Sequence, residues 1–228
     1  MNNLDFENII AYRFQDKMLL EKALTHSSYC REHGVESRDS NERLEFLGDA
    51  CFDAVISEEL YQRLEKVDEG KLTKTRALIV CEKSLASVAL RLGVGNYLNL
   101  GKGEEHSGGR KRESILADAL EAIVAAIYLD GGFEAMRQCV AREFASAIDD
   151  ALAGKLFADY KTQVQEVLQK RGKNTKIRYV TDREEGPDHD KTFYVHLVCD
   201  AETMGRGSGK TKKEAEQNAA RATLEGRY

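Results

Sequence analysis

Residues 41–54, Asn-Glu-Arg-Leu-Glu-Phe-Leu-Gly-Asp-Ala-Cys-Phe-Asp-Ala, decide how this chain of 228 residues is interpreted. Glu45 and Asp49 are four residues apart, so a helix places both carboxylates on one face, one turn apart. Glu42 lies one turn earlier, and large apolar residues such as Phe52 predict a mostly buried helix. Buried like charges are costly unless they are paired, protonated or bound to a cation. The stretch indicates a divalent-metal site, with a solvated acidic face as the alternative.

A second acidic pair strengthens the metal interpretation. In the stretch from Glu113 to Val124, Asp118 and Glu121 are three residues apart, and the residues around them are apolar and small. If the two helices pack antiparallel, four carboxylates can converge on one cavity. A set of oxygen ligands without His or Cys suits Mg²⁺ or Mn²⁺ better than zinc. A di-iron bundle would need Glu-x-x-His repeats, which the sequence lacks.

Composition indicates two domains in a cytoplasmic protein. The formal net charge is −5, yet Asp159 to Arg227 holds 14 lysine and arginine residues against 12 acidic ones, leaving 20 against 27 elsewhere. This asymmetry favours a slightly basic C-terminal domain with a separate task. The five scattered cysteines include no CxxC pair and are interpreted as reduced thiols. Neither a signal peptide nor an apolar run of membrane-spanning length is recognisable.

The N-terminal part is predicted to be all-α. Thr25-His26-Ser27 follows the first helices, and we expect His26 to hydrogen-bond near a helix end because no second histidine lies at ligand spacing. Asp39 or Ser40 is the expected N-cap of the central helix. A Gly-rich loop is expected at 92–109 and a polar loop at 31–40. Helical segments are expected at residues 5–29, 41–61, 71–91, 113–124 and 132–151.

The C-terminal part has the pattern of a small α+β domain. A helix at 161–170 precedes strands at 177–180, 192–199 and 201–205, and a final helix follows the glycines of 205–209. Pro187, the only proline, lies in the first turn between strands. Lys210, Lys212 and Lys213 stand at the start of the last helix, where the helix dipole disfavours cations. Backbone N–H groups and lysines together form a phosphate site, so this placement suggests an anionic partner.

These motifs resemble those of the bacterial ribonuclease III family over nearly the whole chain. The match rests on Asn41 to Asp49, on Glu113 to Glu121, and on the Gly207-Ser-Gly-Lys-Thr-Lys-Lys-Glu-Ala block. The resemblance implies an all-α endonuclease domain at 1–152, a linker at 153–159 and a double-stranded-RNA-binding domain of α-β-β-β-α order at 160–228. It implies the metal ligands Glu45, Asp49, Asp118 and Glu121, and it implies that Asp49 and Glu121 are the catalytic residues.

The resemblance also implies supporting and RNA-binding residues. Glu42, Glu69 and Glu104 match acidic positions with lesser roles near the site. Minor-groove contacts are expected first from one helix and then from the turn between strands. Lys210, Lys212 and Lys213 match contacts to phosphates across the major groove. The minor-groove set comprises Thr162, Gln165, Glu166 and Gln169 on the helix, and Pro187 and His189 in the turn.

The expected activity is Mg²⁺-dependent hydrolysis of double-stranded RNA, with Mn²⁺ able to substitute. The family implies products with 5′-phosphate and 3′-hydroxyl ends, roles in ribosomal- and messenger-RNA processing, and a homodimer whose two sites cut opposite strands. Two ions about 3.5–4 Å apart would clamp the attacking and leaving oxygens. One alternative is a double-stranded-RNA-binding regulator that does not cleave. A second is a carboxylate-rich phosphohydrolase acting on a small molecule, which the basic C-terminal domain disfavours.

Overall fold

The protein is described here from a computed structural model, which describes residues 3–153, 160–169, 176–187 and 191–226. The chain divides into two compact units, Met1–Phe157 and Ala158–Tyr228. From residue 154 onward, the predicted linker at 153–159 lies outside the described residues. Among the described residues, no helix is long and apolar enough to cross a membrane.

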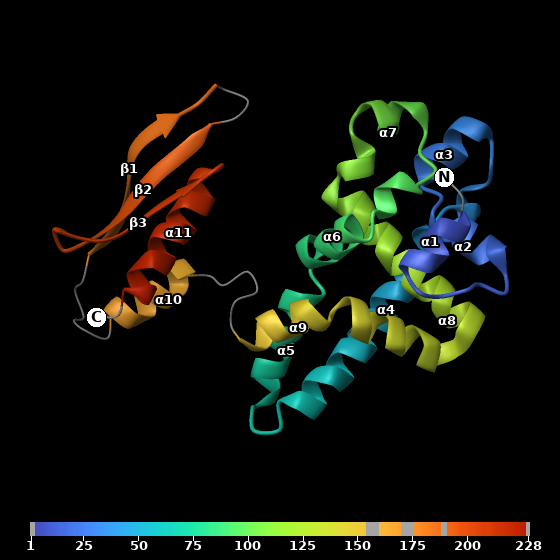
Figure 1. The fold of residues 1–228 in the computed structure, drawn as a ribbon, viewed down its shortest axis with the longest axis horizontal. Helices are drawn as coiled ribbons and strands as arrows, with labels where there is room; N and C mark the ends of the chain where they lie inside the picture. The colour runs from blue at the N-terminus through green and yellow to red at the C-terminus, as the bar shows by residue number, and fades with distance from the viewer. Residues whose placement is uncertain (1–2, 154–159, 170–175, 188–190, 227–228) are drawn as a thin grey trace. The chain divides into compact units, whose positions relative to one another are not determined.

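The first unit is helical, which confirms the predicted fold class of the N-terminal part (Figure 1). Single 3₁₀ turns at Ser37–Asp39, Val94–Asn96 and Gly109–Lys111 connect some of its helices. The helices are α1 Asn3–Ile9, α2 Lys17–Ala23, α3 Ser27–His33, α4 Glu42–Arg63, α5 Glu69–Ile79, α6 Glu82–Arg91, α7 Lys102–His106, α8 Glu113–Glu143 and α9 Ala145–Leu152.

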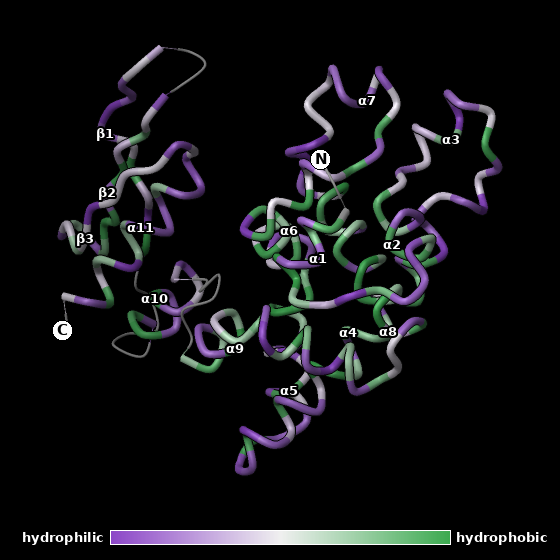
Figure 2. Tube along the Cα trace, turned by 45° about the vertical axis from the view of Figure 1, so that its right-hand side comes forward, coloured by the Kyte–Doolittle hydropathy of each residue, from purple (hydrophilic) through white to green (hydrophobic). Residues whose placement is uncertain are grey.

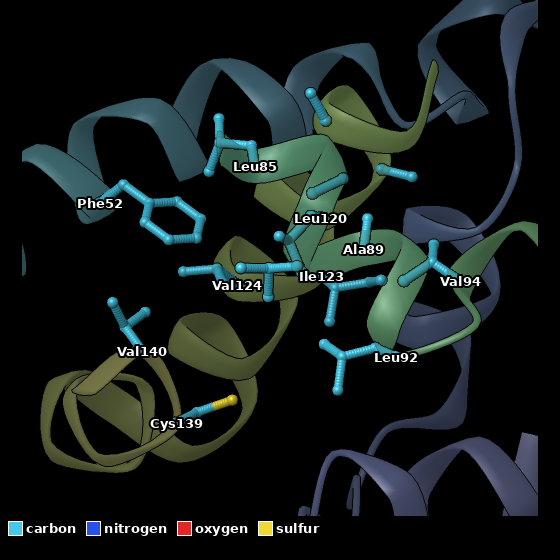
Figure 3. Packing of buried hydrophobic residues seen from close by; sticks show 14 of the residues in the cluster. Phe52, Leu85, Ala89, Leu92, Val94, Leu120, Ile123, Val124, Cys139 and Val140 are labelled. Carbon is cyan, nitrogen blue, oxygen red and sulfur yellow. The ribbon is translucent and has the colours of Figure 1, made fainter. Parts of the chain in front are cut away.

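Helices α4, α6 and α8 form the centre of this unit. Figure 3 shows their apolar side chains meeting in one core, with Phe52 from α4, Leu85 from α6 and Ile123 from α8. Phe52 also packs edge-on against Phe144, with ring centroids 4.9 Å apart. Figure 2 shows hydrophobic segments recurring along α8, whereas α5 is largely hydrophilic. Burial of α8 along most of its length fixes the helix that carries the second acidic pair.

Two predicted boundaries near α4 and α3 are corrected. The N-cap of α4 is Asn41, whose side chain makes no capping hydrogen bond, and neither Asp39 nor Ser40 caps the helix. Asp39 instead pairs with Lys22. The predicted loop at 31–40 begins later, because α3 continues to His33. His26 caps α3 by accepting a hydrogen bond from the Ser28 N–H at 3.2 Å, which confirms its expected structural role.

The helix predicted at 71–91 is two helices. The break falls at Val80 and Cys81, where Cys81 takes an extended conformation and serves as the N-cap of α6. Glycine and proline are absent from 71–91, so the sequence carries no breaker there. The break arises from tertiary packing, since α5 lies against α4 whereas α6 lies against α8.

The segments around 92–112 and 132–151 also differ from expectation. The predicted Gly-rich loop contains α7 and two single turns. Arg110 stabilises this segment by donating hydrogen bonds to the carbonyls of Gly95 and Leu98, both at 2.9 Å. The helix predicted at 132–151 is the end of α8 followed by α9. α8 bends at Gly132, whose φ of 80° lies in the left-handed region that glycine favours.

The second unit has the predicted α-β-β-β-α order. It contains α10 Tyr160–Gln169, β1 Ile177–Glu185, β2 Thr192–Cys199, β3 Glu202–Gly209 and α11 Lys212–Glu225. The sheet is antiparallel in the order β1-β2-β3. β1 extends five residues and β3 four residues beyond the predicted strands. Residues of α10 and α11 pack on Val195 and Leu197 of β2, so both helices cover one face of the sheet (Figure 1).

Candidate metal centre and nucleic-acid interface

The two acidic pairs of the sequence meet where α4 packs on α8. Glu45 of α4 and Asp118 and Glu121 of α8 each offer a carboxylate oxygen, and these oxygens lie within 4.8 Å of one another. All three side chains are half-buried. The structure therefore brings together three of the four predicted ligands from two helices about seventy residues apart in sequence.

A single glycine sets the spacing of the two helices at this point. Gly48 is buried on α4, one turn after Glu45. A Cβ atom built on Gly48 would lie 2.0 Å from the carbonyl oxygen of Glu121. No side chain fits there, so the two backbones cross as closely as glycine allows. This close crossing is what lets short carboxylate side chains from both helices reach the same point.

Asp49 lies beside this group but is more exposed. It is outside the set whose oxygens fall within 4.8 Å. Its charge nevertheless acts on both neighbours, since Asp49 is the largest electrostatic contribution raising the pKa of Glu121 and a smaller one for Glu45. Asp49 therefore adds to the same concentration of negative charge.

Burial and mutual repulsion make it unfavourable for the carboxylates of the cluster to be ionised together without a cation. Burial, followed by the charges of Asp49, Asp118 and Glu45, raises the pKa of Glu121 to about 8. Burial is likewise the largest cause of the raised pKa of Glu45 and of Asp118. A divalent cation would relieve this repulsion, and an all-oxygen donor set suits a hard ion such as Mg²⁺ or Mn²⁺. The residues present therefore fit a divalent metal.

This electrostatic arrangement predicts how the metal-free protein responds to pH. The pKa of Glu121 is about 8 in the folded protein against an ordinary value of 4.5. A raised pKa means that the group stabilises the fold below the ordinary value and that this contribution is lost as pH rises through the folded value. In EDTA at pH 8, Glu121→Gln should therefore melt higher than wild type, by on the order of a few degrees.

The comparison is made by thermal melts of both proteins at two pH values. At about pH 5 the difference should largely vanish, because Glu121 is then mostly protonated in the folded wild type. Adding Mg²⁺ at pH 8 should raise the melting temperature of wild type more than that of the variant. An equal difference at both pH values would contradict the raised pKa of Glu121.

The supporting acidic residues occupy different surroundings. Glu42 is exposed in the first turn of α4, and its charge raises the pKa of Glu45. Glu69 is exposed at the start of α5 and accepts a hydrogen bond from the Thr73 hydroxyl at 2.8 Å. Glu104 on α7 pairs with Arg112, the N-cap residue of α8. Glu42 therefore adds to the negative charge of the cluster.

Two further carboxylates act on the cluster that sequence reasoning did not include. The charge of Glu82 raises the pKa of Asp118, and the charge of Asp53 raises that of Glu121. Asp53 stands four residues after Asp49 on α4, so its helical spacing could have indicated it. Glu82 stands in the first turn of α6. Its position depends on the break between α5 and α6, which the sequence does not signal.

The predicted RNA contacts of the second unit lie on its surface where they are described. Thr162, Gln165, Glu166 and Gln169 are exposed, and their spacing places them on one side of α10. The opposite side buries Val164 and Leu168 in the core. Pro187 is exposed after β1, and His189 lies outside the described residues.

The predicted lysine cluster does stand at a helix N-terminus. Thr211 caps α11 by accepting a hydrogen bond from the Glu214 N–H at 3.1 Å. Lys210, Lys212 and Lys213 flank this cap and are exposed. Lys212 also lies 3.5 Å from Glu184 of β1. A helix N-terminus flanked by exposed lysines is a surface suited to phosphate.

Known proteins resemble both units. The family model for Ribonuclease-III-like domains matches residues 16–148, and that for the double-stranded RNA binding motif matches residues 160–226. Ribonuclease 3 of Caldanaerobacter subterraneus subsp. tengcongensis is 51% identical over 96% of this chain and 95% of its own. Ribonuclease 3 of Pelotomaculum thermopropionicum is 47% identical over 96% of this chain and 90% of its own.

A solved structure agrees with these sequence matches. It is a nuclease domain of ribonuclease III from Campylobacter jejuni, described for structural flexibility in the region involved in dimer formation. It is 43% identical with a TM-score of 0.60, and the match covers 64% of this chain and 97% of that one. With relatives this similar over nearly its full length, the chain belongs to the ribonuclease III family.

Proposed function

We propose that this protein hydrolyses phosphodiesters of double-stranded RNA at a Mg²⁺ centre held by Glu45, Asp49, Asp118 and Glu121, leaving 5′-phosphate and 3′-hydroxyl ends. The observation that carries the proposal is the convergence of Glu45, Asp118 and Glu121, whose oxygens lie within 4.8 Å of one another. Membership of the ribonuclease III family supplies the reaction class. Mn²⁺ is expected to substitute, because it takes the same oxygen ligands.

The chain's own residues contribute binding and orientation at this centre. Bound divalent ions would supply activation of a water nucleophile and stabilisation of charge on the leaving oxygen. The carboxylates hold and orient the ions and are not themselves the nucleophile. The close crossing at Gly48 keeps Glu45 near Glu121 without an intervening side chain. Asp49 and Glu121 are proposed as the catalytic pair, as the family resemblance implies.

The second unit is proposed to bind the duplex. In this proposal residues 1–152 form the nuclease domain, 153–159 the linker and 160–228 the RNA-binding domain. The exposed residues of α10 would contact one minor groove, and Pro187 with His189 the next. Lys210, Lys212 and Lys213 would contact phosphates across the major groove. Such a domain reads the shape and 2′-hydroxyls of about 16 base pairs with little sequence preference.

A homodimer is proposed because cutting both strands needs two sites related by a two-fold axis. The proposal is supported by Phe46, which is 83% exposed on α4 directly after Glu45. Tyr61, near the end of the same helix, is 75% exposed. Such large apolar side chains would lose water-accessible surface if a partner covered this helix. A second copy of this chain is the proposed occupant.

Changing Phe46 to Ser should weaken this dimer. Burying a phenylalanine contributes about 1.5–3 kcal/mol, and two-fold symmetry doubles the loss to about 3–6 kcal/mol, or 10²–10⁴-fold in dissociation constant. Sedimentation equilibrium measures it directly. Met18→Ser is the control, because Met18 is comparably exposed, at 75%, but lies on α2 and not on α4. A Phe46→Ser protein with unchanged dimer affinity would place the interface elsewhere.

A cytoplasmic location and action on ribosomal- and messenger-RNA precursors are proposed from the family resemblance and from cysteine usage. All five cysteines are free thiols, three of them buried. Free buried thiols are typical of proteins from reducing compartments.

The function is tested by cleavage of a labelled RNA hairpin of about two helical turns, long enough for the RNA-binding domain. We expect cleavage of both strands with Mg²⁺ or Mn²⁺ and none in EDTA. End analysis should give 5′-phosphates. Tight binding without cleavage in either metal would leave the non-cleaving regulator, which no relative described above supports.

A further inference from the structure

Within the described residues of the RNA-binding unit, the helices pack on one face of the sheet and leave its other face uncovered. α10 and α11 pack on the face formed by Val195 and Leu197. Since side chains alternate along a strand, Tyr194 and His196 point to the opposite face. The strand register places Arg183 and Ser208 on either side of Tyr194, and Arg206 beside His196. This open face therefore gathers arginines around an aromatic ring, away from the candidate contacts of α10 and the lysines of α11.

Its central feature is a stacked pair at the rim of a hollow. The guanidinium of Arg183 lies 4.2 Å from the ring centroid of Tyr194. An open hollow of about 330 Å³ adjoins them, and it is also lined by Asp182, Arg206 and Ser208. A β-bulge between Thr181 and Arg183 places both Asp182 and Arg183 at this hollow.

The charged side chains that line the hollow differ in whether a described residue pairs with them. Arg183 has an ion-pair partner in Glu185, at 2.7 Å. Asp182 lies 2.7 Å from His196. Arg206 is exposed, and among the described residues no ion pair to it is found. The hollow thus offers a planar stacking platform, carboxylate and hydroxyl oxygens, and in Arg206 a cation that no described residue pairs with.

We propose that this hollow binds an unpaired nucleotide of RNA. The Arg183–Tyr194 stack would receive the base, because aromatic rings and guanidinium planes stack on any base. Arg206 would contact the phosphate, and Asp182 or Ser208 the polar edge of the base. The aromatic platform favours RNA over an acidic peptide here, because a base stacks on it whereas a peptide does not need it. The inference rests on RNA being the substrate, as proposed above.

The site would discriminate unpaired from paired RNA. Bases in a duplex are stacked on their neighbours and cannot reach a platform on the protein, whereas splayed single-stranded bases can. The RNA-binding unit would then hold a duplex through α10 and α11 and an adjoining single strand through the sheet. Such a second contact would favour substrates whose duplex continues into a loop or unpaired extension.

The test compares two RNAs bound by the full-length protein in EDTA. One is a blunt duplex of about 20 base pairs and the other the same duplex with about eight unpaired nucleotides. Wild type should bind the extended RNA more tightly than the blunt duplex. Arg206→Ala or Tyr194→Leu should lower the affinity for the extended RNA about tenfold. Blunt-duplex affinity should stay unchanged in both variants. Tyr194→Phe, which keeps the ring, should behave as wild type.

Arg221→Ala is the control for loss of one positive charge. Arg221 lies on α11 and donates a hydrogen bond to Glu225, so the Arg221→Ala protein should bind both RNAs as wild type does. Arg206 is exposed, so its variant remains informative if Tyr194→Leu fails to fold. The inference would be overturned if wild type bound both RNAs with equal affinity. It would also be overturned if Arg206→Ala lowered the affinity for both RNAs by the same factor. Failure of wild type to bind the blunt duplex would instead count against the proposed function.

Discussion

Glu121→Gln should abolish cleavage of double-stranded RNA and leave duplex binding intact. The side chain keeps its size but loses the negative charge at the centre of the acidic cluster. Metal-ion stabilisation of the transition state contributes several kcal/mol, so loss of an ion corresponds to about 10³-fold or more in rate. The proposed RNA contacts belong to the other unit, so affinity for the duplex should not change.

Single-turnover cleavage and gel-shift binding of one labelled hairpin measure both quantities. The matched control is Glu134→Gln, the same chemical change on the same helix. Glu134 is exposed and bonded to Arg137, outside the cluster, so this variant should cleave normally. If Glu121→Gln retained wild-type cleavage in Mg²⁺, the carboxylates of α4 and α8 would not form the centre. If it lost duplex binding as well, the separation of binding from cleavage would be wrong.

The acidic centre could be predicted because helical spacing is a local property. Glu45 and Asp49, and Asp118 and Glu121, share a helix face whatever the tertiary structure. The approach of the two helices could not be worked out from spacing, since it depends on Gly48 meeting the backbone of Glu121. Glu82 was missed for a similar reason. The charge of Glu82 acts on Asp118 only because the predicted helix is interrupted at Val80 and α6 packs against α8.

The RNA-binding unit shows where strand patterns lose their signal. β1 was predicted to end at Val180 but continues to Glu185. Its last residues, Asp182 to Glu185, are charged and exposed, and the bulge after Thr181 breaks their alternation. A strand exposed on both sides has no apolar period to recognise. The overlooked segment supplies Asp182 and Arg183 to the proposed nucleotide site.

Gly48→Ala should damage the protein more than any other single-methyl change near the site. The new Cβ would lie 2.0 Å from a backbone oxygen of α8, which cannot move aside as a flexible side chain would. The two central helices must separate, and overpacking of this kind costs about 1–3 kcal/mol or more. Since displacement of about 1 Å at a catalytic group can cost 10²-fold in rate, activity should fall by at least that factor.

Melting temperature and cleavage rate should be measured together, at a temperature where circular dichroism shows Gly48→Ala to be folded. Gly103→Ala is the control, because Gly103 lies on α7 and an added Cβ would meet nothing within 4 Å. That substitution should be neutral or stabilise by up to about 1 kcal/mol, since alanine is the better helix former. A folded Gly48→Ala protein with little activity would mean that the close crossing of α4 and α8 holds the carboxylates in position. Normal stability together with normal cleavage would refute that role for Gly48.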